Sequence, residues 1–120
     1  MGSFNRIRIS ENATIKLRTL KGRTGLTPNI LCRIALCYSL NNQNISSIVE
    51  ADENGQEFNQ YTLTGEFHSY FIALVKERCI QDGLDPEKEL IKQFKLHLNN
   101  GILAIYGRIN GLPDLINLLK

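Results

Sequence analysis

Six cationic side chains occur within the first 23 residues, and they are the residues whose types and spacing could do chemistry. Two lie in a short alternating stretch and four lie in residues 16–23, where no acidic side chain occurs: Arg6, Arg8, Lys16, Arg18, Lys21 and Arg23. Guanidinium and ammonium groups donate charge-assisted hydrogen bonds to phosphate oxygens. This set therefore predicts binding of a polyanion, although a solvated, solubilising face is the plainer interpretation.

The start of a predicted second helix extends this candidate site. Thr27 should cap free backbone N–H groups, and Pro28 suits the first helical position, where its missing N–H is not needed. A helix start attracts phosphate because its unpaired N–H groups and the positive end of its dipole point outward. The predicted polyanion site therefore comprises the six cations together with Thr27 and Asn29.

Side chains typical of catalysis or metal binding are present but poorly arranged. His68 and His97 are expected on different helices, and neither has a nearby Ser, Cys or Asp pattern that would suggest a catalytic triad. Cys32 and Cys37 are five positions apart on a predicted helix, so they point about 140° apart, the wrong geometry for one tetrahedral metal ion. We expect no enzyme activity, no cofactor and no metal site, and we interpret the thiols, including that of Cys79, as buried structural groups.

Charge is distributed unevenly along the 120 residues, although the net charge is only +2. Residues 1–40 hold seven basic residues and one acidic residue, a charge of +6, whereas the rest holds seven basic and eleven acidic residues, a charge of −4. Such segregation usually keeps a face for a polyanion, and nucleic acid is a commoner partner than a membrane. We expect one domain, 1–120, with a basic strand-helix-helix part over 1–40 and a helical scaffold over 41–120.

The cysteine count and the hydropathy favour a location in the cytoplasm. Three cysteines are an odd number, and no signal peptide precedes them, which favours reduced thiols in the cytoplasm. No run of 18 apolar residues occurs, so we expect no membrane partner.

Hydrophobic periodicity and cap residues predict a mainly α-helical chain with one short N-terminal strand. Residues 4–9 alternate as a strand does, which would place Phe4 on the same face as Arg6 and Arg8. A first helix should begin at Ser10 and stop at Gly22 to Gly25. Further helices are expected over residues 28–40, 64–81, 85–100 and 113–119, and residues 102–109 are also favoured as helix. Phe67 and Ile91 should lie on inner faces of these helices. We expect a loop around Ile48 and Val49 and an extended stretch over residues 58–63.

Two of these elements favour an oligomer. The strand at residues 4–9 has no strand-like candidate for some fifty residues, so pairing with the same strand of a second subunit is attractive. The helix expected over residues 28–40 is apolar on nearly every face, so we expect it to be buried on every side. We expect a homo-oligomer, with a tetramer favoured over a dimer. The arrangement resembles ribbon-helix-helix DNA binders, whose two-stranded ribbon would place Arg6 and Arg8 in the major groove.

Several short motifs also carry a resemblance to a known family. They are RIRIS at residues 6–10, LRTLK at 17–21, TGLTPN at 24–29, RIAL at 33–36, YTLTGE at 61–66, ERC at 77–79 and HLNNG at 97–101. In these motifs the chain resembles the DndE family of bacterial DNA phosphorothioation systems. The resemblance implies a helical, oligomeric, non-catalytic accessory protein that binds DNA while other proteins of the system replace a backbone oxygen with sulfur.

The sequence leaves two other functions open. The main alternative is a ribbon-helix-helix transcriptional regulator with a partner domain after residue 41, and an enzyme is a remote third possibility. A regulator must read base edges, whereas an accessory factor can rely on phosphate charge alone. For the accessory protein we expect double-stranded DNA as partner, with nicked duplexes favoured because a nick lowers the cost of bending.

Overall fold

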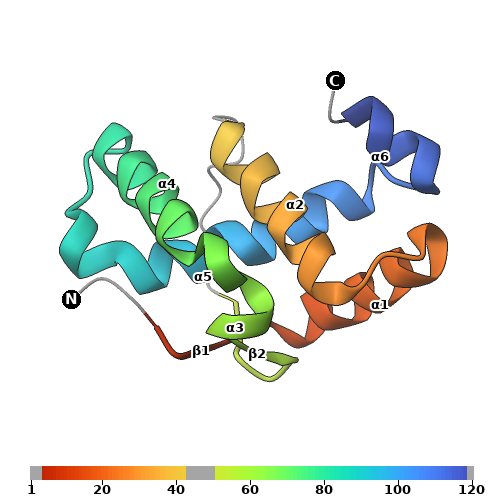
Figure 1. Cartoon of the computed structure of the whole chain (residues 1–120), viewed down its shortest axis with the longest axis horizontal. Coiled ribbons are helices and arrows are strands. Elements are labelled where there is room, and N and C mark those ends of the chain that lie inside the picture. The colour runs from red at the N-terminus through yellow and green to blue at the C-terminus, as the bar shows by residue number, and fades with distance from the viewer. Residues whose placement is uncertain (1–3, 43–50, 119–120) are drawn as a thin grey trace.

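Helices make up most of the computed structural model, which describes residues 4–42 and 51–118 (Figure 1). In chain order the elements are β1 (Arg6–Arg8), α1 (Glu11–Thr24), α2 (Pro28–Asn41), β2 (Glu57–Asn59), α3 (Gln60–Leu63), the 3-10 helix η1 (Gly65–Phe67), α4 (His68–Gln81), α5 (Pro86–Tyr106) and α6 (Leu112–Leu118). A mainly α-helical chain with a short N-terminal strand is therefore confirmed.

The long helix α5 lies at the centre of the fold and packs against α1, α2 and α4. Its apolar side chains recur every three or four positions, so Phe94, Leu98 and Ile102 fall on one inward face and are fully buried. Leu31 of α2 and Val75 of α4 meet this face and are equally buried. The core thus joins residues of the basic N-terminal part to residues of the C-terminal part.

The helix α1 begins as predicted and ends later than predicted. Ser10 is its N-cap, because the Ser10 hydroxyl accepts a hydrogen bond from the N–H of Ala13 at 3.0 Å. The expectation that Gly22 helps to stop the helix is wrong: Gly22 lies inside α1. Only Gly25 ends it, with a φ of 77° that L side chains rarely adopt.

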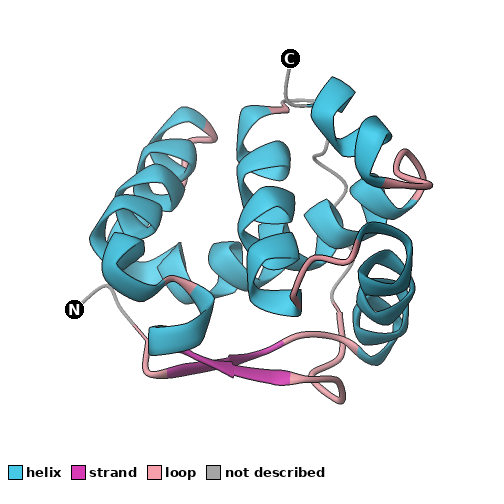
Figure 2. Cartoon of the chain, turned by 45° about the vertical axis from the view of Figure 1, so that its right-hand side comes forward, coloured by secondary structure: helices cyan, strands magenta, loops and turns pink. Residues whose placement is uncertain are grey.

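Strand β1 pairs within its own chain, so the expected pairing with a second subunit is wrong. It runs antiparallel to β2, and the two strands lie beneath the helices in Figure 2. Ile7 stands opposite Phe58, and both side chains are buried. The stretch predicted to be extended, residues 58–63, overlaps this partner strand, but most of the stretch forms α3. Phe4 also departs from the prediction, since it precedes β1 and is buried against Phe94, with ring centroids 4.8 Å apart.

Helix α2 has the predicted start but is not buried on every side in the single chain. Leu31, Cys32, Ala35 and Leu36 face α1 and α5 and are buried. The opposite side, which includes Ile34, Tyr38 and an exposed Cys37, is open or half-buried. An interface formed by that side stays a prediction.

The C-terminal helices depart from the predictions in their limits and in their inner faces. The helix predicted over residues 64–81 is divided into η1 and α4, and Phe67 of η1 is 52% exposed rather than buried. Helix α5 starts at the Asp85 cap but continues through Gly101 to Tyr106, and Ile91 is exposed on its outer side. The predicted loop around Ile48 and Val49 lies outside the described residues.

Candidate nucleic-acid interface

The two arginines of β1 share one carboxylate from the neighbouring strand. Arg6 and Arg8 each approach a different oxygen of Glu57 at 3.3 Å, and Arg8 also donates to the carbonyl oxygen of Gly55 at 3.0 Å. All three side chains are exposed enough for water to screen these ion pairs. The pairs cancel part of the positive charge of the two arginines.

Lys16 and Arg23 come together at the ring of Tyr106. The Lys16 ammonium lies 4.4 Å and the Arg23 guanidinium 4.8 Å from the ring centroid. Seven positions separate the two residues, nearly two helical turns, so they share one flank of α1. Arg23 also donates to the carbonyl oxygens of Tyr106 and Ile109 at 3.4 and 3.3 Å, where α5 ends. Arg23 therefore has a structural role as well as a positive charge.

Arg18 and Lys21 lie on another side of α1 and are exposed. At 100° per residue, Arg18 points about 160° away from Lys16. Arg18 lines a shallow hollow with Asn54, Gly55 and Gln56, beside the approach to β2. Neither Arg18 nor Lys21 forms an ion pair within the described residues. The six predicted cations thus occupy different sides of α1 and the ribbon rather than one continuous patch.

The start of α2 matches the prediction in its proline but not in its cap. Thr27 is the N-cap and Pro28 the first helical residue, yet the Thr27 hydroxyl makes no cap hydrogen bond. Only its backbone takes part, because the carbonyl oxygen of Thr27 accepts from the N–H of Leu31 at 3.0 Å. Thr27 is exposed and Asn29 half-buried. The capping role predicted for the Thr27 side chain is wrong.

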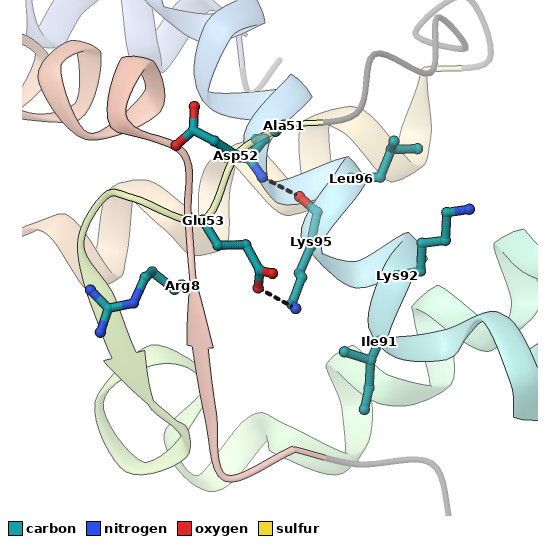
Figure 3. A pocket seen from close by; sticks show the side chains of 9 residues that line it. Arg8, Ala51, Asp52, Glu53, Ile91, Lys92, Lys95 and Leu96 are labelled. Atoms are coloured by element: carbon teal, nitrogen blue, oxygen red, sulfur yellow. Dashed lines mark hydrogen bonds and ion pairs between the residues drawn. The ribbon is translucent and has the colours of Figure 1, made fainter.

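Two cations that the sequence did not single out lie across a hollow from Arg8 (Figure 3). They are Lys92 and Lys95 of α5, and the hollow has a volume of about 510 Å³. Lys95 pairs with Glu53 at 2.5 Å, and Asp52 lies at the same rim. Both lysines belong to the part of the chain with a net negative charge, so a count of charges hid them. Three cations and two carboxylates line the hollow, so its charge is mixed and only weakly positive.

The described residues contain a Ser–His contact that the sequence did not reveal. Ser39 Oγ and His97 Nδ1 are 2.8 Å apart, and both side chains are buried. Burial lowers the pKa of His97 to about 4, and the nearby Arg78 guanidinium adds to this effect. Arg78 itself donates to the carbonyl oxygens of Ser39 and Leu40 at the end of α2. The contact is closed to solvent and stabilises the junction of α2, α4 and α5.

The cysteines have different surroundings. Cys32 and Cys79 are buried, as predicted, whereas Cys37 is exposed. Burial raises the pKa of the Cys32 thiol, so it is uncharged at neutral pH. No group of three or more His, Cys, Asp or Glu side chains could hold a metal ion in the part of the chain that the structure describes.

Comparison with known proteins identifies the family. The family model described as DNA sulphur modification protein DndE matches residues 6–111, which is most of the chain. This chain belongs to the DndE family. No helix in the described ranges, 4–42 and 51–118, is long and apolar enough to cross a bilayer.

Solved DndE structures share the fold. The chain is similar to the crystal structure of DndE from Escherichia coli B7A, involved in DNA phosphorothioation modification, with 30% identity, a TM-score of 0.70, and coverage of 85% of this chain and 96% of that one. It is also similar to a double glycine-to-lysine variant of DndE, with 28% identity, a TM-score of 0.66, and coverage of 88% and 99%. No curated protein matches the chain.

Proposed function

We propose that this DndE family member is a non-catalytic accessory protein of DNA phosphorothioation that binds duplex DNA through its basic surface. The observation that carries the proposal is the match to the family of DNA sulfur modification over residues 6–111. The exposed cations of α1 support it, because Arg18 and Lys21 pair with no carboxylate among the described residues. Such groups attract phosphate whatever the base sequence.

Two observations support the absence of catalysis. The Ser39–His97 contact is buried and its imidazole has a low pKa, so it offers substrate neither access nor an effective base. The thiols of Cys32 and Cys79 are buried, and desolvation raises the pKa of the more accessible Cys37 thiol, so none of the three is set up as a reactive thiolate that could carry sulfur. We infer that the sulfur chemistry belongs to other proteins of the system, with which this chain works in the cytoplasm.

The transcriptional regulator is the weaker alternative. A ribbon-helix-helix regulator needs a ribbon built from two subunits, whereas β1 here pairs with β2 of its own chain. In addition, Glu57 occupies the guanidinium groups of Arg6 and Arg8, which a regulator would direct at base edges.

A binding titration tests the proposal. Intact, nicked and palindromic duplexes of equal length would be titrated at several salt concentrations. We expect sequence to matter little, nicked duplexes to bind more tightly, and affinity to fall with salt by a log–log slope of about 0.9 per phosphate contact. Tight binding to a single palindrome with weak salt dependence would instead support the regulator.

We also propose that the chain forms a homo-oligomer, with a tetramer favoured, through the open side of α2. Ile34, Cys37, Tyr38 and Leu118 line a largely apolar hollow of about 400 Å³ on this side. Covering it removes apolar surface from water. Sedimentation should show an assembly at micromolar concentration that Ile34→Lys dissociates. A wild-type monomer under these conditions would refute this proposal and leave DNA binding to be judged separately.

A further inference from the structure

The cations of this chain are held in two different ways. Within the described residues, five pair with carboxylates: Arg6, Arg8, Lys76, Arg78 and Lys95. Three others lie over aromatic rings and form no ion pair with any described carboxylate: Lys16, Arg23 and Arg108. A cation paired with a carboxylate must give up that partner, or share it, when it meets a phosphate. A cation held by a ring keeps its full charge.

The ring of Tyr106 orders two of these cations at the end of α5. Lys16 and Arg23 both lie within 5 Å of its centroid, at 4.4 and 4.8 Å. Arg23 uses only Nη1 for the carbonyl oxygens of Tyr106 and Ile109. Because a guanidinium carries five N–H donors, its Nε and Nη2 groups stay available for a phosphate. Both side chains are half-buried, so their positions are restricted before any ligand binds.

Arg108 adds a third such cation from the same segment. It lies 5.6 Å from the centroid of the ring of Tyr38, which borders the proposed interface on α2, and is exposed in the single chain. Only two positions separate Arg108 from Tyr106, so their backbones are no more than about 7 Å apart. The ends of α1 and α5 meet here, on the right of Figure 1. The sequence hid this neighbourhood, because two of its residues lie in the C-terminal part of the chain, which has a net negative charge.

We propose that Lys16, Arg23, Tyr106 and Arg108, here called the tyrosine-held cluster, are the main phosphate contact of bound DNA, with Tyr106 as a positioning residue. This inference rests on the proposed function and names the surface that carries it out. Lys16, Arg23 and Arg108 bind backbone oxygens, and the Tyr106 ring holds Lys16 and Arg23 at a fixed separation. Ordered cations lose less side-chain entropy on binding than free ones.

Charge reversal at Arg108 tests the cluster, with Lys88 as the matched control. Both are exposed cations without an ion pair in the described ranges, and the length of α5 places them roughly 30 Å apart. The full-length variants Arg108→Glu and Lys88→Glu change the net charge equally. We expect Arg108→Glu to weaken binding of a random duplex about tenfold and to flatten the salt slope by about one, and Lys88→Glu to change affinity less than about threefold.

Tyr106 is tested without any change of charge. Tyr106→Leu should weaken duplex binding severalfold, while its thermal transition stays close to that of the wild type. Tyr106→Phe keeps the aromatic ring, so it should bind duplex as tightly as the wild type. The ring resonances of Tyr106 should shift in NMR spectra when duplex is added to the wild type, which a purely structural role would not produce.

The outcomes separate this inference from the proposed function. If the wild type binds duplexes and Arg108→Glu behaves like Lys88→Glu, the tyrosine-held cluster is rejected and the proposed function stands. If the wild type binds no duplex at all, both are rejected. Should Tyr106→Leu fail to fold, the paired charge reversals still decide the matter.

Discussion

Gly101 of α5 touches the backbone of Ala35 in α2 so closely that a side chain has no room. A Cβ atom built on Gly101 would stand 2.0 Å from the carbonyl oxygen of Ala35. Real Cβ atoms do not come so near to backbone, which cannot move aside as a flexible side chain can. The absence of a side chain at residue 101 therefore sets the distance at which the two central helices cross.

Gly101→Ala should consequently destabilise the fold by about 1–3 kcal/mol, the usual cost of forcing extra volume into a packed core. Gly22→Ala is the matched control, because Gly22 also lies in a helix but has no atom within 4 Å of an added Cβ. It should stabilise α1 by about 0.5–1 kcal/mol. Urea titrations of both variants provide the measurement, and equal effects of the same sign would contradict the packing argument.

Stability should decrease as the pH falls through the range in which His97 titrates. Its pKa is about 4 in the folded protein and 6.5 when unperturbed, because burial, helped by Arg78, disfavours the imidazolium. The folded state therefore binds fewer protons than the unfolded state between these values. The contribution, about 3 kcal/mol, is complete above pH 6.5 and is lost as the pH falls towards 4.

Denaturant titrations from pH 7.5 to 4 would measure this loss. His97→Gln should be less stable than the wild type at pH 7, because the contact with Ser39 changes, but its stability should depend less on pH over the same range. A variant with the pH dependence of the wild type would assign the effect to other groups.

Lys21→Glu should weaken the binding of intact and of nicked duplexes by the same factor, and it should flatten the log–log dependence of affinity on salt by roughly one. Lys21 lies about 140° around α1 from Lys16, on a different flank from the tyrosine-held cluster. Its effect should therefore be smaller than that of Arg108→Glu. Fluorescence anisotropy at three salt concentrations would rank the two variants, and a loss confined to one base sequence would speak against phosphate contacts.

The three thiols should report assembly and folding separately. If the chain assembles through the open side of α2 as proposed, alkylation with iodoacetamide should be slow at Cys37 as well as at the buried Cys32 and Cys79. In Ile34→Lys, Cys37 should become reactive while the other two stay protected until the protein unfolds. Peptide mapping by mass spectrometry distinguishes them. Fast labelling of Cys37 in an assembly proven by sedimentation would place the interface elsewhere.

Local signals in the sequence were sufficient for most helix starts and for the inward faces. Ser10 and Asp85 act as caps where the pattern of polar residue and apolar repeat placed them. The end of α5 could not be predicted in this way. Asn100 and Gly101 have the chemistry of a helix stop, but α5 continues through both, and the glycine serves instead the close approach to Ala35, a residue 66 positions away.

The candidate site shows the same division between local and distant information. The sequence identified the cations of residues 6–23 but not the groups that hold them, because Glu57 and Tyr106 come from distant parts of the chain. A count of charges also assigns the C-terminal part to scaffold, although Arg108 brings a cation from there to the end of α1. Only the tertiary structure distinguishes a cation cancelled by a carboxylate from one that keeps its charge.

The pairing of β1 with β2 has a consequence for the order of folding. Ile7 and Phe58 are 51 positions apart, and bringing together the ends of so long a free chain costs roughly 3–4 kcal/mol in loop-closure entropy. The neighbouring helices α1 and α2 can meet first, since their contacts are local. We expect the ribbon to close after the transition state, so Ile7→Ala should mainly accelerate unfolding in stopped-flow experiments. The arginines of β1 would then be the last of the predicted DNA contacts to reach their final positions.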